Sequence, residues 1–226
     1  MRNALKAGLT IAAKDLRIER RSKEVFTTMM VFALILIVIF SFAFEPTAEE
    51  TRRIAGGLLW IAFTFAGILG LSRSFARETT NECLQGLLLT PAGPGAVYLG
   101  KLASNVAFML AAEAVVLPIF AVFYNIGLGS RFPWLAGILL LGTWGFASVS
   151  TTFSAITANT RMRELMLPLL VLPISVPLLI AMVEATATWI AGEPMREAYL
   201  WLQLMTGFDI IFTVASLLLF PYIVEE

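Results

Sequence analysis

The sequence contains no histidine and only one cysteine, Cys83, among its 226 residues. The absence of histidine removes the commonest metal ligand and the usual general base of enzymes. A single cysteine excludes an intrachain disulfide and any cysteine-rich metal centre. The net charge is zero and no long basic block is present, so nothing in the composition points to nucleic acid. No catalytic set of residues can be assembled from what remains.

Charged residues are scarce as well, at 14% of the chain, whereas hydrophobic residues make up 58% and the mean hydropathy is +0.83. A soluble domain carries about 25% charged residues. Here the apolar residues fall in long uncharged runs, and an α-helix needs about 20 apolar residues to cross the hydrocarbon core of a bilayer. The sequence therefore predicts an all-α integral membrane protein with a single transmembrane domain, and it excludes a soluble enzyme. Six spans are expected, at residues 25–44, 54–71, 102–124, 132–158, 165–190 and 200–224.

Lysine and arginine are distributed unequally between the two sides of these spans. The leader (residues 1–24) and the connections after the second and fourth spans hold twelve of the 16 basic residues. Such residues favour the cytoplasmic side, so both termini are expected in the cytoplasm. The other side has only Arg52, Arg53, Arg131 and Arg196.

The leader is predicted to be an amphipathic helix. Its basic residues lie largely away from one apolar face, a pattern that suits a helix lying in the membrane surface. Two interpretations stay open: the helix only anchors and orients the chain, or it is an elbow helix that also contacts a partner. The residues of the apolar face are Leu5, Leu9, Ala12, Ala13 and Leu16.

The connection between the second and third spans, residues 72–100, is the longest. Its first half, residues 73–89, can be helical, and a proline- and glycine-rich stretch at 90–95 then breaks the chain. A short cytoplasmic helix with one apolar side is a surface that a soluble partner can bind, and the alternative is a helix resting on the bilayer. The candidate contact residues are Arg73, Phe75, Arg77, Glu78, Glu82, Gln85 and Leu87.

Residues 95–101 match the spacing of a phosphate-binding loop up to its lysine, Lys101. The next residue has to be Ser or Thr to hold magnesium, but it is Leu102, and a turn stands where a buried strand is required. We therefore expect the chain itself to bind no nucleotide. Lys101 is interpreted as an interfacial anchor at the start of the third span.

Two acidic residues, Glu113 and Asp209, lie deep inside apolar spans. At about 1.5 Å per residue, both are expected near the membrane midplane. No basic residue lies at that depth, so each acid has to find polar neighbours or take up a proton. Together they indicate either a polar patch on a pathway or protonated acids hydrogen-bonded between helices. The candidate neighbours are Asn105, Thr143, Ser148, Ser150, Thr151 and Thr206.

Interior prolines and glycines are expected to shape the bundle. Proline inside a helix frees a carbonyl and bends the helix, whereas glycine allows neighbouring helices to approach closely. The prolines are Pro118, Pro168, Pro173 and Pro177, and the glycines are Gly67, Gly70, Gly142 and Gly145.

Several stretches together resemble the CcmB family, cytochrome c maturation protein B. The likeness covers essentially the whole chain, and its more specific parts are the 72–100 connection and the run LVLPISVPLL at residues 170–179. The resemblance implies the permease subunit of an ABC transporter, with an exporter (ABC-2-like) permease fold, in the bacterial inner membrane. The other matching stretches are RIAGGLLW at 53–60 and residues 14–17, 73–75, 87–91 and 100–101.

The same resemblance implies a complex with a second copy of the chain, a CcmA-like ATPase subunit that binds ATP and magnesium, and CcmC-like and CcmD-like membrane subunits. ATP hydrolysis would support haem export or release of a haem-loaded, CcmE-like periplasmic chaperone. Residues 73–89 would hold the coupling helix, and Asp15 and Arg17 would belong to the elbow helix. Because the chain lacks histidine, we expect it to bind no cofactor and haem to be held elsewhere in the complex.

Two other functions remain open from the sequence. The chain is then an ABC-type exporter permease for another substrate, such as a lipid or a drug, or a membrane scaffold that recruits a partner without transport.

Overall fold

The computed structural model describes residues 2–44, 49–80, 93–129, 131–158, 160 and 162–225. Within these ranges the regular secondary structure is helical, as the sequence predicts. The helices are α1 (Arg2–Ser22), α2 (Glu24–Ala43), α3 (Glu49–Thr80), α5 (Pro94–Phe123), α6 (Phe132–Thr157), α7 (Arg163–Ala191) and α8 (Tyr199–Glu225).

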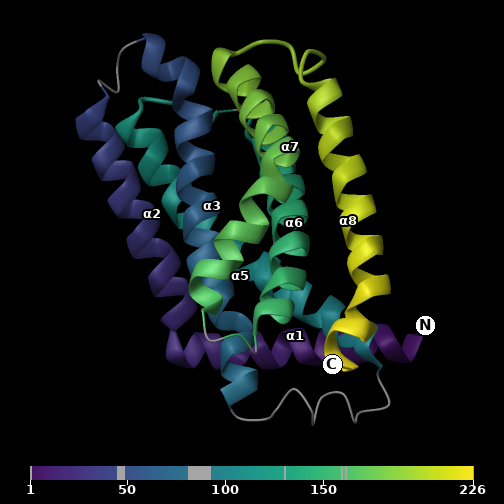
Figure 1. The fold of residues 1–226 in the computed structure, drawn as a ribbon. Coiled ribbons are helices and arrows are strands. Elements are labelled where there is room, and N and C mark those ends of the chain that lie inside the picture. Colours follow the sequence, from purple (N-terminus) through teal and green to yellow (C-terminus); the bar gives the residue numbers. More distant parts are fainter. Residues whose placement is uncertain are drawn as a thin grey trace.

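Six of these helices stand side by side, and α1 lies across one end of the bundle (Figure 1). The six upright helices, α2, α3, α5, α6, α7 and α8, are each long and apolar enough to cross a membrane. The two termini lie at the end of the bundle that α1 covers. Both termini lie at one end because the number of spans is even. The six apolar helices confirm the expected six-span, all-α architecture. We call the end covered by α1 the inner end and the opposite end the outer end.

Four spans begin and end within two residues of their expected bounds, but α3 and α5 are longer than the hydropathy pattern predicts. α3 continues to Thr80 where hydropathy predicts that the span ends at residue 71, and α5 begins at Pro94 rather than at 102. The helix predicted over residues 73–89 is therefore present as far as Thr80, as a continuation of α3, and its remaining residues lie outside the described ranges. Hydropathy marks only the apolar part of a helix, and backbone hydrogen bonding continues into its polar ends. Proline suits the first turn of α5 because the amide there has no intrahelical partner to lose.

A tight corner turns the chain from α1 into α2. Lys23 between them adopts a left-handed conformation with φ 56°. The buried Glu19 side chain accepts a hydrogen bond from the backbone N–H of Phe26 at 2.9 Å, and so satisfies one of the first amides of α2. The Glu19 carbonyl accepts the Lys23 amide at 2.7 Å. This corner allows α1 to lie flat while α2 runs across the membrane.

Small residues set the close helix contacts, as expected. A Cβ added at Gly67 would lie 2.9 Å from atoms of Met109 and Phe146, and side chains at Gly70, Gly142 and Gly145 would also overlap their neighbours. Gly56 adds a contact that the sequence did not single out, because a Cβ there would lie 3.1 Å from the Val183 carbonyl of α7. The four expected prolines lie inside α5 and α7, and Pro221 inside α8 is a fifth.

Candidate functional site

α1 is docked on α5 rather than lying only against lipid. The two helices cross at Gly8 and Gly100, where a Cβ added to Gly100 would lie 2.7 Å from the Gly8 carbonyl oxygen. Only glycine allows so close an approach, since any side chain would push the helices apart. α1 therefore packs against the first two turns of α5.

The face that α1 buries differs from the face predicted from its leucines. Gly8, Ile11, Ala12 and Glu19 are buried, whereas Leu9 is 68% exposed. The predicted face combined three leucines with Ala12 and Ala13, but the stripe that contacts protein combines Gly8, Ile11 and Ala12 with two acids. Leu9 and Leu16, about two turns apart on α1, are left at the surface, where lipid can cover them.

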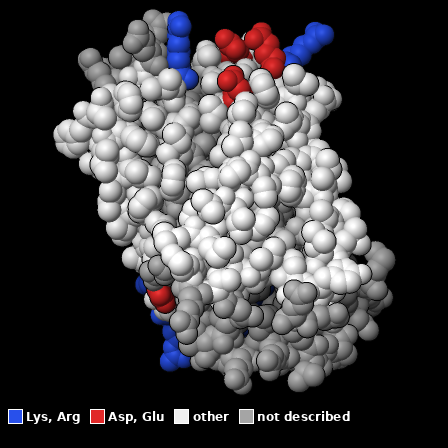
Figure 2. All heavy atoms as spheres, in the orientation of Figure 1, with Lys and Arg blue, Asp and Glu red and all other residues white. Residues whose placement is uncertain are grey.

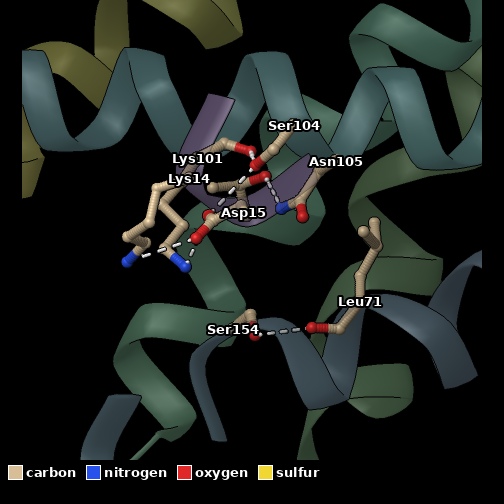
Figure 3. Close-up of polar contacts among 8 residues, drawn as sticks. Lys14, Asp15, Leu71, Lys101, Ser104, Asn105 and Ser154 are labelled. Carbon is tan, nitrogen blue, oxygen red and sulfur yellow. Dashed lines mark hydrogen bonds and ion pairs between the residues drawn. The ribbon is translucent and has the colours of Figure 1, made fainter. Parts of the chain in front are cut away.

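Asp15 completes the docked face of α1 with a buried ion pair to α5 (Figure 3). Its carboxylate Oδ2 lies 2.9 Å from Lys101 Nζ, and the Ser104 hydroxyl donates to the same oxygen at 3.3 Å. Lys14 Nζ lies 3.2 Å from Oδ1. The Lys101 side chain is only 3% exposed and that of Asp15 10%. An ammonium group so deeply buried needs a carboxylate partner.

The interpretation of Lys101 as an interfacial anchor at a helix start is therefore wrong. Lys101 lies two turns inside α5, because the helix begins at Pro94, and α1 covers it. Its partner Asp15 was selected from the sequence only by family resemblance. Arg17, selected in the same way, is exposed on α1.

Further hydrogen bonds continue from this ion pair into the bundle (Figure 3). Asn105 of α5 donates to the Thr151 hydroxyl of α6 at 2.8 Å, and Ser154 of α6 donates to the Leu71 carbonyl of α3 at 3.1 Å. These contacts link α1 to α5, α5 to α6 and α6 to α3 within the inner half of the bundle. We call Asp15, Lys101, Ser104, Asn105, Thr151 and Ser154 the inner polar chain.

The predicted partner-contact residues fall largely outside what the structure describes. Four of them lie on the last two turns of α3, whose backbone is described but whose side chains are not, namely Arg73, Phe75, Arg77 and Glu78. The other three lie outside the described residues, namely Glu82, Gln85 and Leu87. Their role as contacts stays a prediction.

Glu113 lies in the core between α5 and α6, with its side chain 2% exposed. Its Oε1 accepts a hydrogen bond from the Thr143 hydroxyl of α6 at 2.6 Å, which is one of the contacts the sequence offered. Its Oε2 is buried and has no hydrogen-bond partner in the described part of the chain. Beside it lies a small cavity of about 10 Å³, lined mainly by apolar residues such as Met109 and Phe63. That volume is at the lower limit for one water molecule.

Asp209 of α8 approaches α6 from another direction. Its Oδ1 is buried without a hydrogen-bond partner among the described residues, and a Cβ added at Gly145 would overlap this atom. Gly145 and Thr143 differ by about 3 Å in height along α6, so both acids lie at a similar depth, as predicted. They contact different faces of α6 and do not form a pair with each other.

The other proposed neighbours of the two acids make different contacts. Thr206 is exposed and donates to the Leu202 carbonyl, and Ser148 donates to the Gly145 carbonyl. Asn105 and Thr151 bind each other, as described above. Within the described ranges, no three His, Cys, Asp or Glu side chains come together as a group that could hold a metal ion.

These features define a polytopic helical membrane protein with six spans, whose amphipathic first helix is fixed to the bundle by buried charges. A model of the CcmB protein family matches residues 6–225. The chain therefore belongs to the CcmB family.

Curated relatives extend over most of the chain. It is 32% identical over 210 residues to heme exporter protein B of Paracoccus denitrificans, covering 92% of each protein. It is 33% identical over 175 residues to the protein of that name from Rhodobacter capsulatus, covering 75% of this chain and 78% of the relative. The corresponding protein of Pseudomonas aeruginosa is 28% identical over 204 residues, covering 90% of this chain and 91% of the relative.

Proposed function

We propose that this chain is the membrane permease subunit of an ABC transporter that exports haem for cytochrome c maturation in the bacterial inner membrane. Membership of the CcmB family and relatives named heme exporter protein B support the proposal. Six spans with both termini at one end fit such a subunit. The chain is not itself an enzyme. ATP with magnesium is bound and hydrolysed by a separate CcmA-like subunit.

The observation that carries the mechanism is the buried contact between α1 and α5. The inner polar chain begins at this contact, at the end where the basic residues predict the cytoplasm. A cytoplasmic ATPase that binds residues 73–89 would move the inner end of α3. The Leu71 carbonyl of α3 accepts a hydrogen bond from Ser154 of α6, and Thr151 of α6 accepts one from Asn105 of α5. A displacement of α3 is therefore passed to α6 and α5, and through the ion pair of Lys101 to α1.

The same helices carry the movement to the middle of the membrane. Thr143 lies on α6 about three turns above Ser154, and its hydroxyl holds Glu113 of α5. A shift of α6 against α5 therefore changes the hydrogen bond of a buried acid that lies beside a small cavity. In this mechanism the chain transmits ATP-driven motion.

Haem is the cargo of this system, and we propose that other subunits hold it. Histidine is absent from the sequence, and the nine methionines are expected mainly to pack the core. The proposed complex contains a second copy of the chain, CcmC-like and CcmD-like membrane subunits and a CcmE-like haem chaperone on the outer side. ATP hydrolysis supports delivery of haem to this chaperone or its release once loaded.

A mild-detergent pull-down with an ATPase assay tests this function. We expect recovery of a CcmA-like ATPase together with haem-containing and CcmC-like components. Glu78→Ala and Gln85→Ala are expected to lower the amount of ATPase recovered, because both lie in the predicted docking segment. Arg196→Ala is the matched control, since this exposed residue lies at the outer end and should leave recovery unchanged.

Each other outcome contradicts part of the proposal. Recovery of an ATPase without any haem-handling partner would replace haem by another substrate. Absence of an ATPase, under conditions that keep known membrane complexes intact, would overturn the permease function and leave a scaffold. Equal ATPase recovery from all three variants would move the docking site away from residues 73–89.

A further inference from the structure

A charged cavity opens between α3 and α7 at the outer end of the bundle. Its volume is about 720 Å³. Its charged lining consists of Arg52 and Arg53 from α3, Glu184 from α7, and Glu193 from the connection that follows α7. Figure 2 shows that charged side chains gather at the two ends of the molecule, with an uncharged band between them. The cavity therefore lies at the level where lipid headgroups meet the protein.

Arg131 and Trp189 fix one rim of this cavity. Arg131 donates a hydrogen bond to the backbone carbonyl of Glu193, and Trp189 Nε1 donates to the Arg131 carbonyl at 2.8 Å. The Glu193 carboxylate is not used in these bonds. Among the described residues, no ion pair takes up the carboxylates of Glu184 and Glu193 or the guanidinium of Arg52, so these charges are available to a ligand.

An apolar cavity of about 150 Å³ lies deeper along the same two helices. On α3 its lining includes Gly57, Ile61 and Phe65, which continue the spacing of four residues that starts at Arg53. On α7 it includes Val183 and Leu179, which lie four and eight residues before Ala187 of the charged cavity and therefore on the same side of the helix. The two cavities therefore follow one another along a single seam.

The seam has the length of one membrane leaflet. Arg53 and Phe65 are twelve positions apart on α3, which corresponds to about 18 Å. Half of the hydrocarbon core is about 15 Å deep. Ile61 and Phe65 are partly exposed, so the lower part of the seam is open toward the surrounding lipid. A molecule with a charged head and a flexible apolar chain fits this shape.

The charged residues of the cavity at the outer end determine which polar headgroup it can bind. Two arginines and two glutamates present both signs to a ligand, which matches a zwitterion carrying a phosphate and an ammonium group. A dianionic amphiphile, such as a porphyrin with two carboxylates, would meet the arginines but would also be repelled by Glu184 and Glu193.

We propose that the seam between α3 and α7 binds one zwitterionic aminophospholipid of the outer leaflet. Its phosphate accepts hydrogen bonds from Arg52 and Arg53, and its ammonium donates to Glu184 and Glu193. One acyl chain lies along Gly57, Ile61 and Phe65. This inference is independent of the cargo of the transporter.

Native mass spectrometry of the full chain in detergent, with defined lipids added, tests the proposal. We expect phosphatidylethanolamine to be retained better than phosphatidylcholine, whose quaternary ammonium has no N–H to donate, and better than anionic phosphatidylglycerol. The double variant R52A/R53A should lower retention of phosphatidylethanolamine about tenfold, because it removes charge-assisted bonds to phosphate. Arg196→Ala, an exposed arginine at the same end that does not line the cavity, is the matched control.

Two further variants separate the two ends of the ligand. Ile61→Trp fills the apolar part from its exposed rim and should weaken all phospholipids without changing their order. The double variant E184Q/E193Q should shift the preference toward phosphatidylglycerol. Thermal unfolding of each variant, compared with that of Arg196→Ala, reveals any loss that comes from misfolding.

Three results would overturn the proposal. The first is the same retention for all three headgroups, and the second is equal behaviour of R52A/R53A and Arg196→Ala in proteins of equal thermal stability. The third is arginine-dependent binding of a porphyrin dicarboxylate that displaces the phospholipid, which would assign the seam to the cargo.

Discussion

Removal of either charge of the Asp15–Lys101 pair should destabilise the protein far more than removal of both. In Asp15→Asn, the Lys101 ammonium, 3% exposed, loses the carboxylate that lies 2.9 Å away. Breaking a buried ion pair by changing one partner costs about 3–5 kcal/mol. We expect the lower end of this range, about 3 kcal/mol, since the Asp15 side chain is 10% exposed.

The double variant D15N/K101M separates the pair energy from other effects. With both charges removed, no ammonium is left buried, and the loss should be no more than about 1–2 kcal/mol. The stability losses of Asp15→Asn and Lys101→Met, added together, would then exceed the loss of the double variant by a coupling energy of at least about 2 kcal/mol. Lys14→Ala is the control, because its side chain is 40% exposed and a partly exposed pair contributes about 0–1 kcal/mol.

Thermal unfolding in one detergent, followed by the loss of monodisperse protein, measures these differences. A loss of 3 kcal/mol corresponds to a fall in Tm of about 6–12 °C for a chain of this length. The double variant should melt above both single variants. If the single losses add up to the double loss within about 0.5 kcal/mol, the charges do not interact and the docking of α1 has another cause.

Three other substitutions test separate contacts. Gly100→Ala should detach α1 from α5 and make the leader more accessible to protease, whereas Gly127→Ala, with open space around it, should not. Thr143→Val removes the hydroxyl that donates to Glu113 and should lower stability by about 1–3 kcal/mol in the same melting assay. Thr143→Ser keeps this hydroxyl and should retain most of the stability. Lys23→Gly should raise stability by up to about 1 kcal/mol by relieving the left-handed backbone, and Lys23→Ala should not; a gain with alanine would contradict the strain argument.

The six spans could be predicted because each lies in a long uncharged run, and hydrocarbon imposes its thickness on any helix that crosses it. Hydropathy did not predict where α3 ends and α5 begins, nor that the helix expected after residue 72 continues α3 without a break. Helical hydrogen bonds need no apolar side chain, so the helices continue into the polar residues that hydropathy assigns to a connection.

The polar contacts inside the bundle were only partly predictable. The depth of Glu113 and Asp209 follows from counting residues, and Thr143 was among the proposed neighbours of the acids. The pairing of Asp15 with Lys101 depends on how α1 lies on α5, which no local pattern reports. The glycines at positions 8 and 100 are the signal that was missed, because each is the point where the other helix approaches.

The corner at Lys23 and the docking of α1 also constrain how the protein is inserted into the membrane. Asp15 and its hydrogen-bond partner Ser104 are 89 residues apart in the chain, so α1 is synthesised long before its binding surface exists. Until α5 is inserted, α1 stays at the membrane surface, where water in the interface solvates its acidic side chains. The Asp15–Lys101 pair then forms only when Lys101 has reached its correct depth. The ion pair can therefore form only after the first three spans, α2, α3 and α5, have been inserted in the correct register.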